Sequence, residues 1–113
     1  MVEDRTSVSL PKAIDILNYT FYNCTNLTSV SLPACTRIGV KAFFSCTKLA
    51  SIYLLGSSVC TLAKSNAFSG TSIWTNKGSI FVPASLVASY KAATNWTFFS
   101  NRIYSYNHTG AGE

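Results

Sequence analysis

Apolar and small polar residues alternate in four short runs of the chain. In each run an apolar side chain is followed by a serine or an aromatic residue and then by a second apolar one. This period of two predicts strands with one buried face. Proline follows three of the runs and should end the strand, because it cannot donate the next hydrogen bond of a sheet. The predicted inward pairs are Val8/Leu10, Val30/Leu32, Ile52/Leu54 and Ile80/Val82, and the prolines are Pro11, Pro33 and Pro83.

The runs belong to a 22-residue unit that occurs twice in succession, as VSLPKAIDILNYTFYNCTNL and then VSLPACTRIGVKAFFSCTKL. A third unit is looser, with about three extra residues near Gly56, and a fourth repeats only the strand. A fixed period of this length predicts a solenoid, in which each turn buries its apolar side against the next. We therefore expect one domain, with repeats at about 7–28, 29–50 and 51–78, a final strand at 79–83, a C-terminal cap at 84–106 and a flexible tail at 107–113.

Other apolar residues return at the same place in successive units. Identical strands in successive turns must lie parallel and in register, roughly 4.8 Å apart. The recurring side chains should therefore stack into continuous columns that fill the interior. These columns are Ile16/Ile38, Phe21/Phe43/Phe68 and Leu27/Leu49/Ile73.

The segment after the last strand has a different pattern. Residues 84–95 carry Leu86, Val87, Tyr90 and Ala93 at helical spacing, which predicts an amphipathic helix. A dense aromatic block then extends to Tyr106. We expect this block to cap the last apolar columns, and the alternative is an aromatic platform for a sugar or peptide.

A family resemblance rests on the motif C-x-x-L-x-x-V-x-L-P followed by I-x-x-x-A-F, present here as Cys24–Pro33 and then Ile38, Ala42 and Phe43. Over about residues 7–83 the chain resembles the BspA-type leucine-rich repeat of bacterial surface proteins, and residues 82–96 are similar to the segment that often closes such arrays. The resemblance implies an α/β repeat solenoid: a right-handed superhelix with short parallel strands on its concave side, turns or 3₁₀ segments elsewhere and a C-terminal helix. It also implies a noncatalytic adhesion or recognition module for a protein or glycan, extracellular or at the cell surface.

Catalytic side chains are scarce. The chain has four carboxylates, and Asp15 is the only one between residues 5 and 112. Paired-carboxylate chemistry is therefore excluded on count. The single histidine, His108, lies near the end of the chain, and neither a glycine-rich phosphate loop nor zinc-type Cys/His spacing is present. We therefore expect that the protein is not an enzyme and that it binds neither a cofactor nor a metal ion.

The outward positions of the predicted strands are the candidate ligand-binding residues. These positions carry small hydroxyls in the first two repeats and aromatic rings later, a combination that recognition surfaces use. Alternatively, the two aromatic rings pack on the C-terminal cap. The residues are Ser9, Ser31, Tyr53 and Phe81.

Positive charge suggests a second kind of partner. The net charge is +5, and basic residues follow Asp15 without another acidic residue before Glu113. Arg37, Lys41, Lys48 and Lys64 form a candidate basic face for an anionic partner, such as nucleic acid, an acidic glycan or an acidic protein. The alternative is an ordinary solvated surface. The lysines are spread singly, which does not favour nucleic acid, and we expect Arg37 to pair with Asp15 in the preceding turn.

The sequence leaves two other hypotheses about the function open. The protein could be an intracellular or phage-encoded inhibitor that binds a protein or nucleic acid through the basic face. It could also be a structural fragment of a longer repeat array. Salt dependence of binding would separate the basic face from a groove of hydroxyls and aromatic rings.

The four cysteines form two candidate pairs. Cys24 and Cys46 occupy the same place in adjacent units, and Cys35 and Cys60 become equivalent if the insertion near Gly56 is allowed for. Neighbours in such columns lie within disulfide range. Cysteine is also a common small core residue, and we favour free buried thiols.

The chain shows no apolar run long enough to span a bilayer, and residues 1–20 lack the pattern of a signal peptide. The segment MVEDRTS enters the first repeat directly, which predicts an uncapped strand edge. That edge could pair with upstream repeats or with a second copy of the chain. The resemblance favours the cell surface, and a cytoplasmic location stays open.

Overall fold

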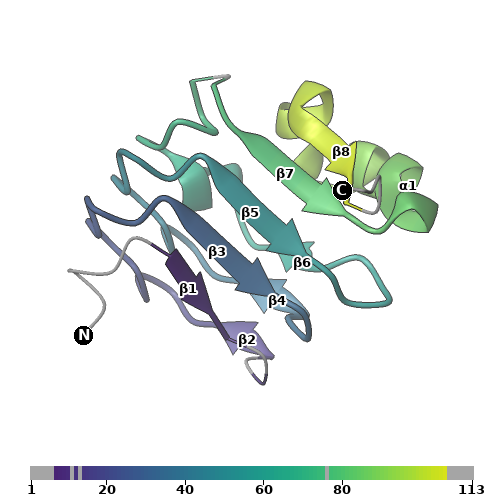
Figure 1. Ribbon diagram of the computed structural model, residues 1–113, viewed down its shortest axis with the longest axis horizontal. Helices are drawn as coiled ribbons and strands as arrows, with labels where there is room; N and C mark the ends of the chain where they lie inside the picture. Colours follow the sequence, from purple (N-terminus) through teal and green to yellow (C-terminus); the bar gives the residue numbers. More distant parts are fainter. Residues whose placement is uncertain (1–6, 11, 13, 76, 107–113) are drawn as a thin grey trace.

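The computed structural model describes residues 7–10, 12, 14–75 and 77–106. Successive turns of the chain each contribute one strand to a larger sheet and one to a smaller sheet behind it (Figure 1). Within the described residues the larger sheet has the order β1-β3-β5-β7-β8 and the smaller has the order β2-β4-β6, and every pairing is parallel. The larger sheet contains β1 (Ser7–Ser9), β3 (Ser29–Leu32), β5 (Ser51–Leu54), β7 (Ser79–Val82) and β8 (Ile103–Ser105). The smaller contains β2 (Asp15–Ile16), β4 (Arg37–Ile38) and β6 (Thr61–Leu62).

The predicted strands and their register are confirmed. Val8 pairs with Val30, Val30 with Ile52, and Ile52 with Ile80, all with buried side chains. β3 ends at Leu32 and β7 ends at Val82, each directly before a proline, as the missing amide donor requires. Pro11, the uncapped edge expected at residues 1–6 and the expected tail at 107–113 lie outside the described residues.

The predicted apolar columns are present in the interior. The rings of Phe21, Phe43 and Phe68 stack with centroids 5.2 and 5.5 Å apart and with planes within 5° of parallel. Each of these rings is almost fully shielded from solvent, and so are the members of the other two columns. Because a side chain of the same shape follows at each turn, every turn continues the packing of the one before it. The observed architecture is a repeat α/β fold with few helices.

The C-terminal helix is shorter than predicted. Residues 84–95 were expected to be helical, but the α-helix α1 covers only Val87–Ala92, preceded by the 3₁₀ helix η2 (Ala84–Leu86). Ala93 is already extended and Asn95 has a left-handed φ of 68°. The chain turns here because Asn95 binds Leu62 of β6 and Trp96 binds Cys60 just before it, and these tertiary contacts override the helical spacing. Two other 3₁₀ helices are η1 (Ser65–Phe68) and η3 (Trp96–Arg102).

Side chains from the cap take the place of a further strand at the edge of the smaller sheet. The backbone N–H of Cys60 donates to the hydroxyl of Tyr90 at 2.7 Å, and the carbonyl of Cys60 accepts from Nε1 of Trp96 at 2.7 Å. Nδ2 of Asn95 donates to the carbonyl of Leu62, also at 2.7 Å. Buried backbone groups left without partners would be costly. Tyr90, Asn95 and Trp96 therefore satisfy this edge by hydrogen bonding as well as covering it.

The end of the aromatic block is a strand, which the sequence prediction missed. Residues 103–105 were assigned to the cap, but they form β8 and extend the larger sheet beyond β7. Ile103 points inward and is buried, whereas Tyr104 is exposed. This alternation is the same as in β5, where Ile52 is buried and Tyr53 faces outward.

A glycine permits the first two turns to approach each other closely. A Cβ at Gly39 would lie 2.8 Å from the carbonyl carbon of Leu17 and 2.6 Å from the amide nitrogen of Asn18. We expect Gly39→Ala to lower the free energy of unfolding by roughly 1 to 3 kcal/mol, because the two backbones must separate. Urea unfolding followed by circular dichroism measures this loss. Gly56→Ala is the matched control, since its Cβ would meet nothing closer than 3.4 Å, and an equal loss in both variants would contradict the explanation.

Candidate recognition surface

The outward residues of the larger sheet form one continuous row. The strand register aligns Ser9, Ser31, Tyr53 and Phe81, the four predicted ligand-binding residues, and adds Tyr104 from β8 at the end. Ser9 is exposed, and the next three are half-buried. The row therefore changes from hydroxyls over β1 and β3 to aromatic rings over β5, β7 and β8.

The rings of this row pack against each other. Tyr53 and Phe81 are stacked with centroids 5.0 Å apart and planes 15° from parallel. Tyr104 continues from Phe81 at 6.2 Å. Because the strands hold the rings side by side, the faces of Tyr53 and Phe81 that point toward each other are covered. A ligand therefore cannot stack between the rings of Tyr53 and Phe81.

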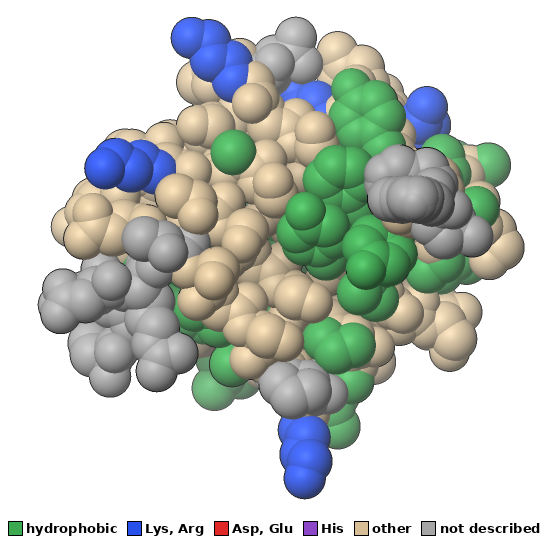
Figure 2. Space-filling model, in the orientation of Figure 1, with side chains coloured by type: hydrophobic (Ala, Val, Ile, Leu, Met, Phe, Trp, Pro, Cys, Tyr) green, Lys and Arg blue, Asp and Glu red, His purple; other side chains and the backbone are tan. Residues whose placement is uncertain are grey.

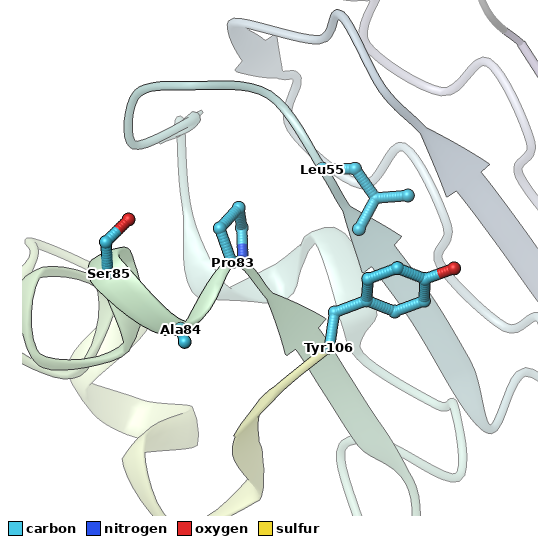
Figure 3. Close-up of a pocket in the computed structure, with 5 residues that line it drawn as sticks. All are labelled: Leu55, Pro83, Ala84, Ser85 and Tyr106. Atoms are coloured by element: carbon cyan, nitrogen blue, oxygen red, sulfur yellow. The ribbon is translucent and has the colours of Figure 1, made fainter. Parts of the chain in front are cut away.

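Tyr106 connects the row to a pocket. Its backbone N–H donates to the carbonyl of Val82, and its ring stands almost perpendicular to that of Tyr53 at 5.7 Å. An open pocket of about 470 Å³ is lined by Leu55, Pro83, Ala84, Ser85 and Tyr106 (Figure 3). The side chains of Leu55 and Tyr106 lie beside Pro83 in this view. The pocket and the row together are termed the aromatic face below.

The larger sheet carries no charged residue in any of its described strands. Figure 2 shows apolar side chains gathered over the β7 and β8 side of the sheet, and the lysine and arginine side chains visible in this view lie apart at the rim. The residues that give the protein its positive net charge therefore lie outside this surface. A ligand of the aromatic face would meet apolar groups and hydroxyls.

The predicted basic residues lie outside the larger sheet. Arg37 is in β4 and contacts the carboxylate of Asp15 at 3.4 Å, which confirms the expected pair across turns. With both side chains about half exposed, such a pair contributes about 0 to 1 kcal/mol. Lys41 places its ammonium group 5.1 Å from the ring of Phe44. Lys48 and Lys64 are exposed in different loops, so the structure does not bring these four cations to the aromatic row.

The sequence prediction did not identify the structural context of two groups of exposed aromatic residues. Tyr104 and Tyr106 were assigned to an aromatic block, expected to be a cap and alternatively a ligand platform, although the pair Ile103-Tyr104 repeats Ile52-Tyr53 of β5 and could have indicated a strand. Tyr19 and Tyr22 are about half exposed in the first turn, where their rings meet edge to face at 5.7 Å. The sequence indicates this second group less clearly, because Tyr19 aligns with Lys41 in the next repeat and the aromatic residue therefore does not recur.

The four cysteines are free, buried thiols, as predicted. Burial raises the pKa of Cys46 to about 12, and its thiol donates to the carbonyl of Phe21 at 2.9 Å. Burial likewise raises the pKa of Tyr90 to about 12, which keeps its hydroxyl neutral beside Cys60. Among the described residues no three His, Cys, Asp or Glu side chains lie together as a metal site would require. His108 is outside the described residues.

Parallel strands contributed by successive copies of a 22-residue unit define a leucine-rich-repeat protein. The family model described as BspA type Leucine rich repeat region (6 copies) matches residues 12–103. The chain belongs to this family. The match begins at residue 12, later than the resemblance seen in the sequence, and it extends past the closing segment at 82–96 to the first residue of β8.

Membership in the family indicates the general class of function. Leucine-rich repeats of this type indicate a protein-interaction module, and such proteins are typically noncatalytic and surface-associated. No curated protein matches the chain. None of the helices in the part of the chain that the structure describes is long and apolar enough to cross a membrane.

Proposed function

We propose that the protein is a noncatalytic recognition module that binds a protein partner through the aromatic face. The supporting observation is the uncharged row of in-register side chains that leads from serines to the rings of Tyr53, Phe81 and Tyr104, beside an open apolar pocket. Aromatic side chains are enriched in protein interfaces, whereas charged residues are depleted at interface centres. The small hydroxyls of Ser9 and Ser31 provide adaptable hydrogen bonds next to them.

The size of this face favours a loop or extended segment of the partner. Five strands about 4.8 Å apart, each three or four residues long, present a face of roughly 20 by 10 to 13 Å. Stable interfaces between globular proteins bury about 800 Å² on each partner. A short peptide segment can instead lie along the row and place one apolar side chain in the pocket near Pro83 and Tyr106.

A glycan is the less favoured ligand. Aromatic recognition of a sugar generally uses an open ring face, and the faces of Tyr53 and Phe81 that meet each other are occupied by their mutual stacking. Ring edges and an apolar pocket suit peptide side chains better. Adhesion at a bacterial surface is part of the proposal, and so are the superhelical winding of the repeats and the placement of the larger sheet on the concave side.

The test starts from a random-peptide phage library selected on the full chain. We expect enriched peptides whose dissociation constant, measured by calorimetry, rises at least about tenfold in Phe81→Ser and in Tyr53→Ser. Binding should change little between about 50 and 500 mM NaCl, because the aromatic face carries no charge. Tyr22→Ser is the matched control, since it removes an exposed tyrosine that lies off the larger sheet, and it should bind normally.

The alternative basic face gives the opposite pattern. Binding would then fall steeply with salt and would be lost in Lys41→Ala and Lys64→Ala but kept in Phe81→Ser. The same variants are also tested for binding to a glycan array. If no peptide is selected and the chain instead binds a specific glycan, and if Phe81→Ser loses that binding, the ligand is a sugar. This result would overturn the proposed protein partner.

A further inference from the structure

Two of the four thiols face each other across adjacent turns. The Sγ atoms of Cys35 and Cys60 are 3.6 Å apart, with the thiol of Cys60 donating to Cys35. Cys35 lies two residues before β4 and Cys60 one residue before β6, whereas the register pairs Arg37 with Thr61. The two cysteines are thus offset by one position, which corrects their expected equivalence. They nevertheless meet, because both side chains are buried in the core.

Cys35 differs chemically from the buried thiol of Cys46. The hydrogen bond from Cys60 lowers the pKa of Cys35 to about 7, although burial and the carboxylate of Asp15 act in the opposite direction. The pKa of Cys60 is raised for the same reason, since its proton is held between the two sulfurs. Thiolates are the reactive form of cysteine. Cys46, in the other pair, has its pKa raised to about 12 by burial and is therefore the contrasting case.

A small oxidant has a path toward this pair. Cys35 is 5% exposed and is flanked by Ala34 and Thr36, both exposed. Cys60 lines a cavity of about 330 Å³ between the third turn and the cap, together with Ala93, Asn95 and Trp96. Hydrogen peroxide is little larger than water, and a cavity of this volume is large enough to admit it.

We propose that Cys35 and Cys60 are a site of reversible oxidation, at which hydrogen peroxide converts the facing thiols into a disulfide between the second and third turns. The sulfur separation is the main support, because bringing 3.6 Å to a bond of about 2.05 Å requires side-chain rotation and only small backbone shifts. This site is separate from the aromatic face and does not depend on the proposed function.

The reaction has two steps. The Cys35 thiolate attacks one oxygen of hydrogen peroxide, so that an S–O bond forms, the O–O bond breaks and hydroxide leaves, giving a sulfenic acid. Cys60 then attacks the sulfur of Cys35, so that the S–S bond forms and the S–O bond breaks. The departing hydroxide takes up the proton of Cys60 as water. In total two thiols and one hydrogen peroxide give one disulfide and two waters, and a thiol reductant reverses the change.

The disulfide would reinforce the part of the fold where the repeats are interrupted. Cys60 ends the insertion that begins after Leu55, and its backbone binds both Tyr90 and Trp96 of the cap. Cross-linking it to Cys35 closes a loop and reduces the freedom of the unfolded chain. We expect the melting temperature to rise by roughly 5 to 15 °C on oxidation and to return after reduction.

The experiment treats the full chain with hydrogen peroxide, blocks the remaining thiols under denaturing conditions and measures the mass. We expect loss of two hydrogen atoms and labelling of only Cys24 and Cys46. Trypsin leaves Cys24 and Cys35 together in peptide 13–37, with Cys60 in 49–64 and Cys46 in 42–48. Fragmentation of the disulfide-linked peptides should therefore place the bond between Cys35 and Cys60.

Two variants assign the roles within the pair. In Cys60→Ser the hydroxyl can still donate to Cys35, but no disulfide can form, so dimedone should trap a sulfenic acid at Cys35. In Cys35→Ser we expect no trapping at Cys60. A bond between Cys24 and Cys46, a bond between two chains, or four labelled thiols after peroxide treatment would each overturn the proposal.

Discussion

Phe43→Ala should lower the free energy of unfolding by about 3 to 5 kcal/mol, the largest effect expected for any single change in the repeats. Phe43 is fully buried and its ring is stacked on both sides, by Phe21 at 5.2 Å and by Phe68 at 5.5 Å. Removal of the ring opens a cavity in the middle of a column that the neighbouring turns cannot fill. Small domains have about 5 to 15 kcal/mol of stability in total, so the loss should be visible as a large shift of the urea midpoint.

The next residue supplies the control. Phe44 is half-buried and its ring lies against Tyr22 and the ammonium group of Lys41 outside the core. We expect Phe44→Ala to cost about 1 kcal/mol, since the ring leaves a contact that solvent can fill. Equal losses in Phe43→Ala and Phe44→Ala would show that the phenylalanine column does not carry the stability assigned to it.

Trp96→Ala should lower the free energy of unfolding by a similar amount, about 3 to 5 kcal/mol. The indole is fully buried, packs edge to face on Tyr90 at 5.3 Å and donates from Nε1 to the carbonyl of Cys60. Its loss leaves a large cavity and also deprives a buried carbonyl of its donor. Trp96→Phe separates the two contributions, because it keeps most of the apolar volume but not the hydrogen bond, and it should fall between the wild type and the alanine variant.

The cap variant should also affect the aromatic face. Trp96 begins the segment that leads to β8, so its removal should loosen the strand that carries Tyr104 and precedes Tyr106. Hydrogen exchange should increase at the amides of β8 more than at those of β3. Phe98→Ala is the control, because Phe98 lies in the same segment and is 49% exposed. If Phe98→Ala increased exchange in β8 as much as Trp96→Ala does, the role assigned to Trp96 would be contradicted.

The repeats were predictable because each position recurs. Val8 and Val30, or Phe21 and Phe43, occupy the same place in two units, and a side chain that returns at a fixed spacing can only stack on its own copy. The larger sheet from β1 to β7 and the interior columns followed from this argument. The ion pair between Asp15 and Arg37 followed from it as well.

The elements that the sequence did not reveal depend on contacts specific to one place. The strands of the smaller sheet are only two residues long, which is too short for alternation to be recognised. The end of α1 and the left-handed Asn95 are set by hydrogen bonds to β6, which no helical spacing encodes. β8 was missed because residues 96–106 were treated as one aromatic block, although only Trp96, Phe99 and Ile103 of that block are buried.

The candidate surface was predictable in part for the same reason. Ser9, Ser31, Tyr53 and Phe81 follow from the strand register, and the structure aligns them. Their extension by Tyr104 and Tyr106 required knowledge of β8. The separation of this face from the basic residues required the three-dimensional arrangement, because Lys41 and Phe81 belong to different sides of different turns.

The location of ligand contact on the larger sheet is tested most directly by two-dimensional NMR of the full chain titrated with a peptide selected from the library. The largest changes in amide chemical shift are expected at Tyr53, Phe81, Tyr104 and Tyr106, with few changes in β2, β4 and β6. Changes centred instead on Arg37, Lys41 and Lys64, with the amides of β5, β7 and β8 unaffected, would contradict recognition through the aromatic face.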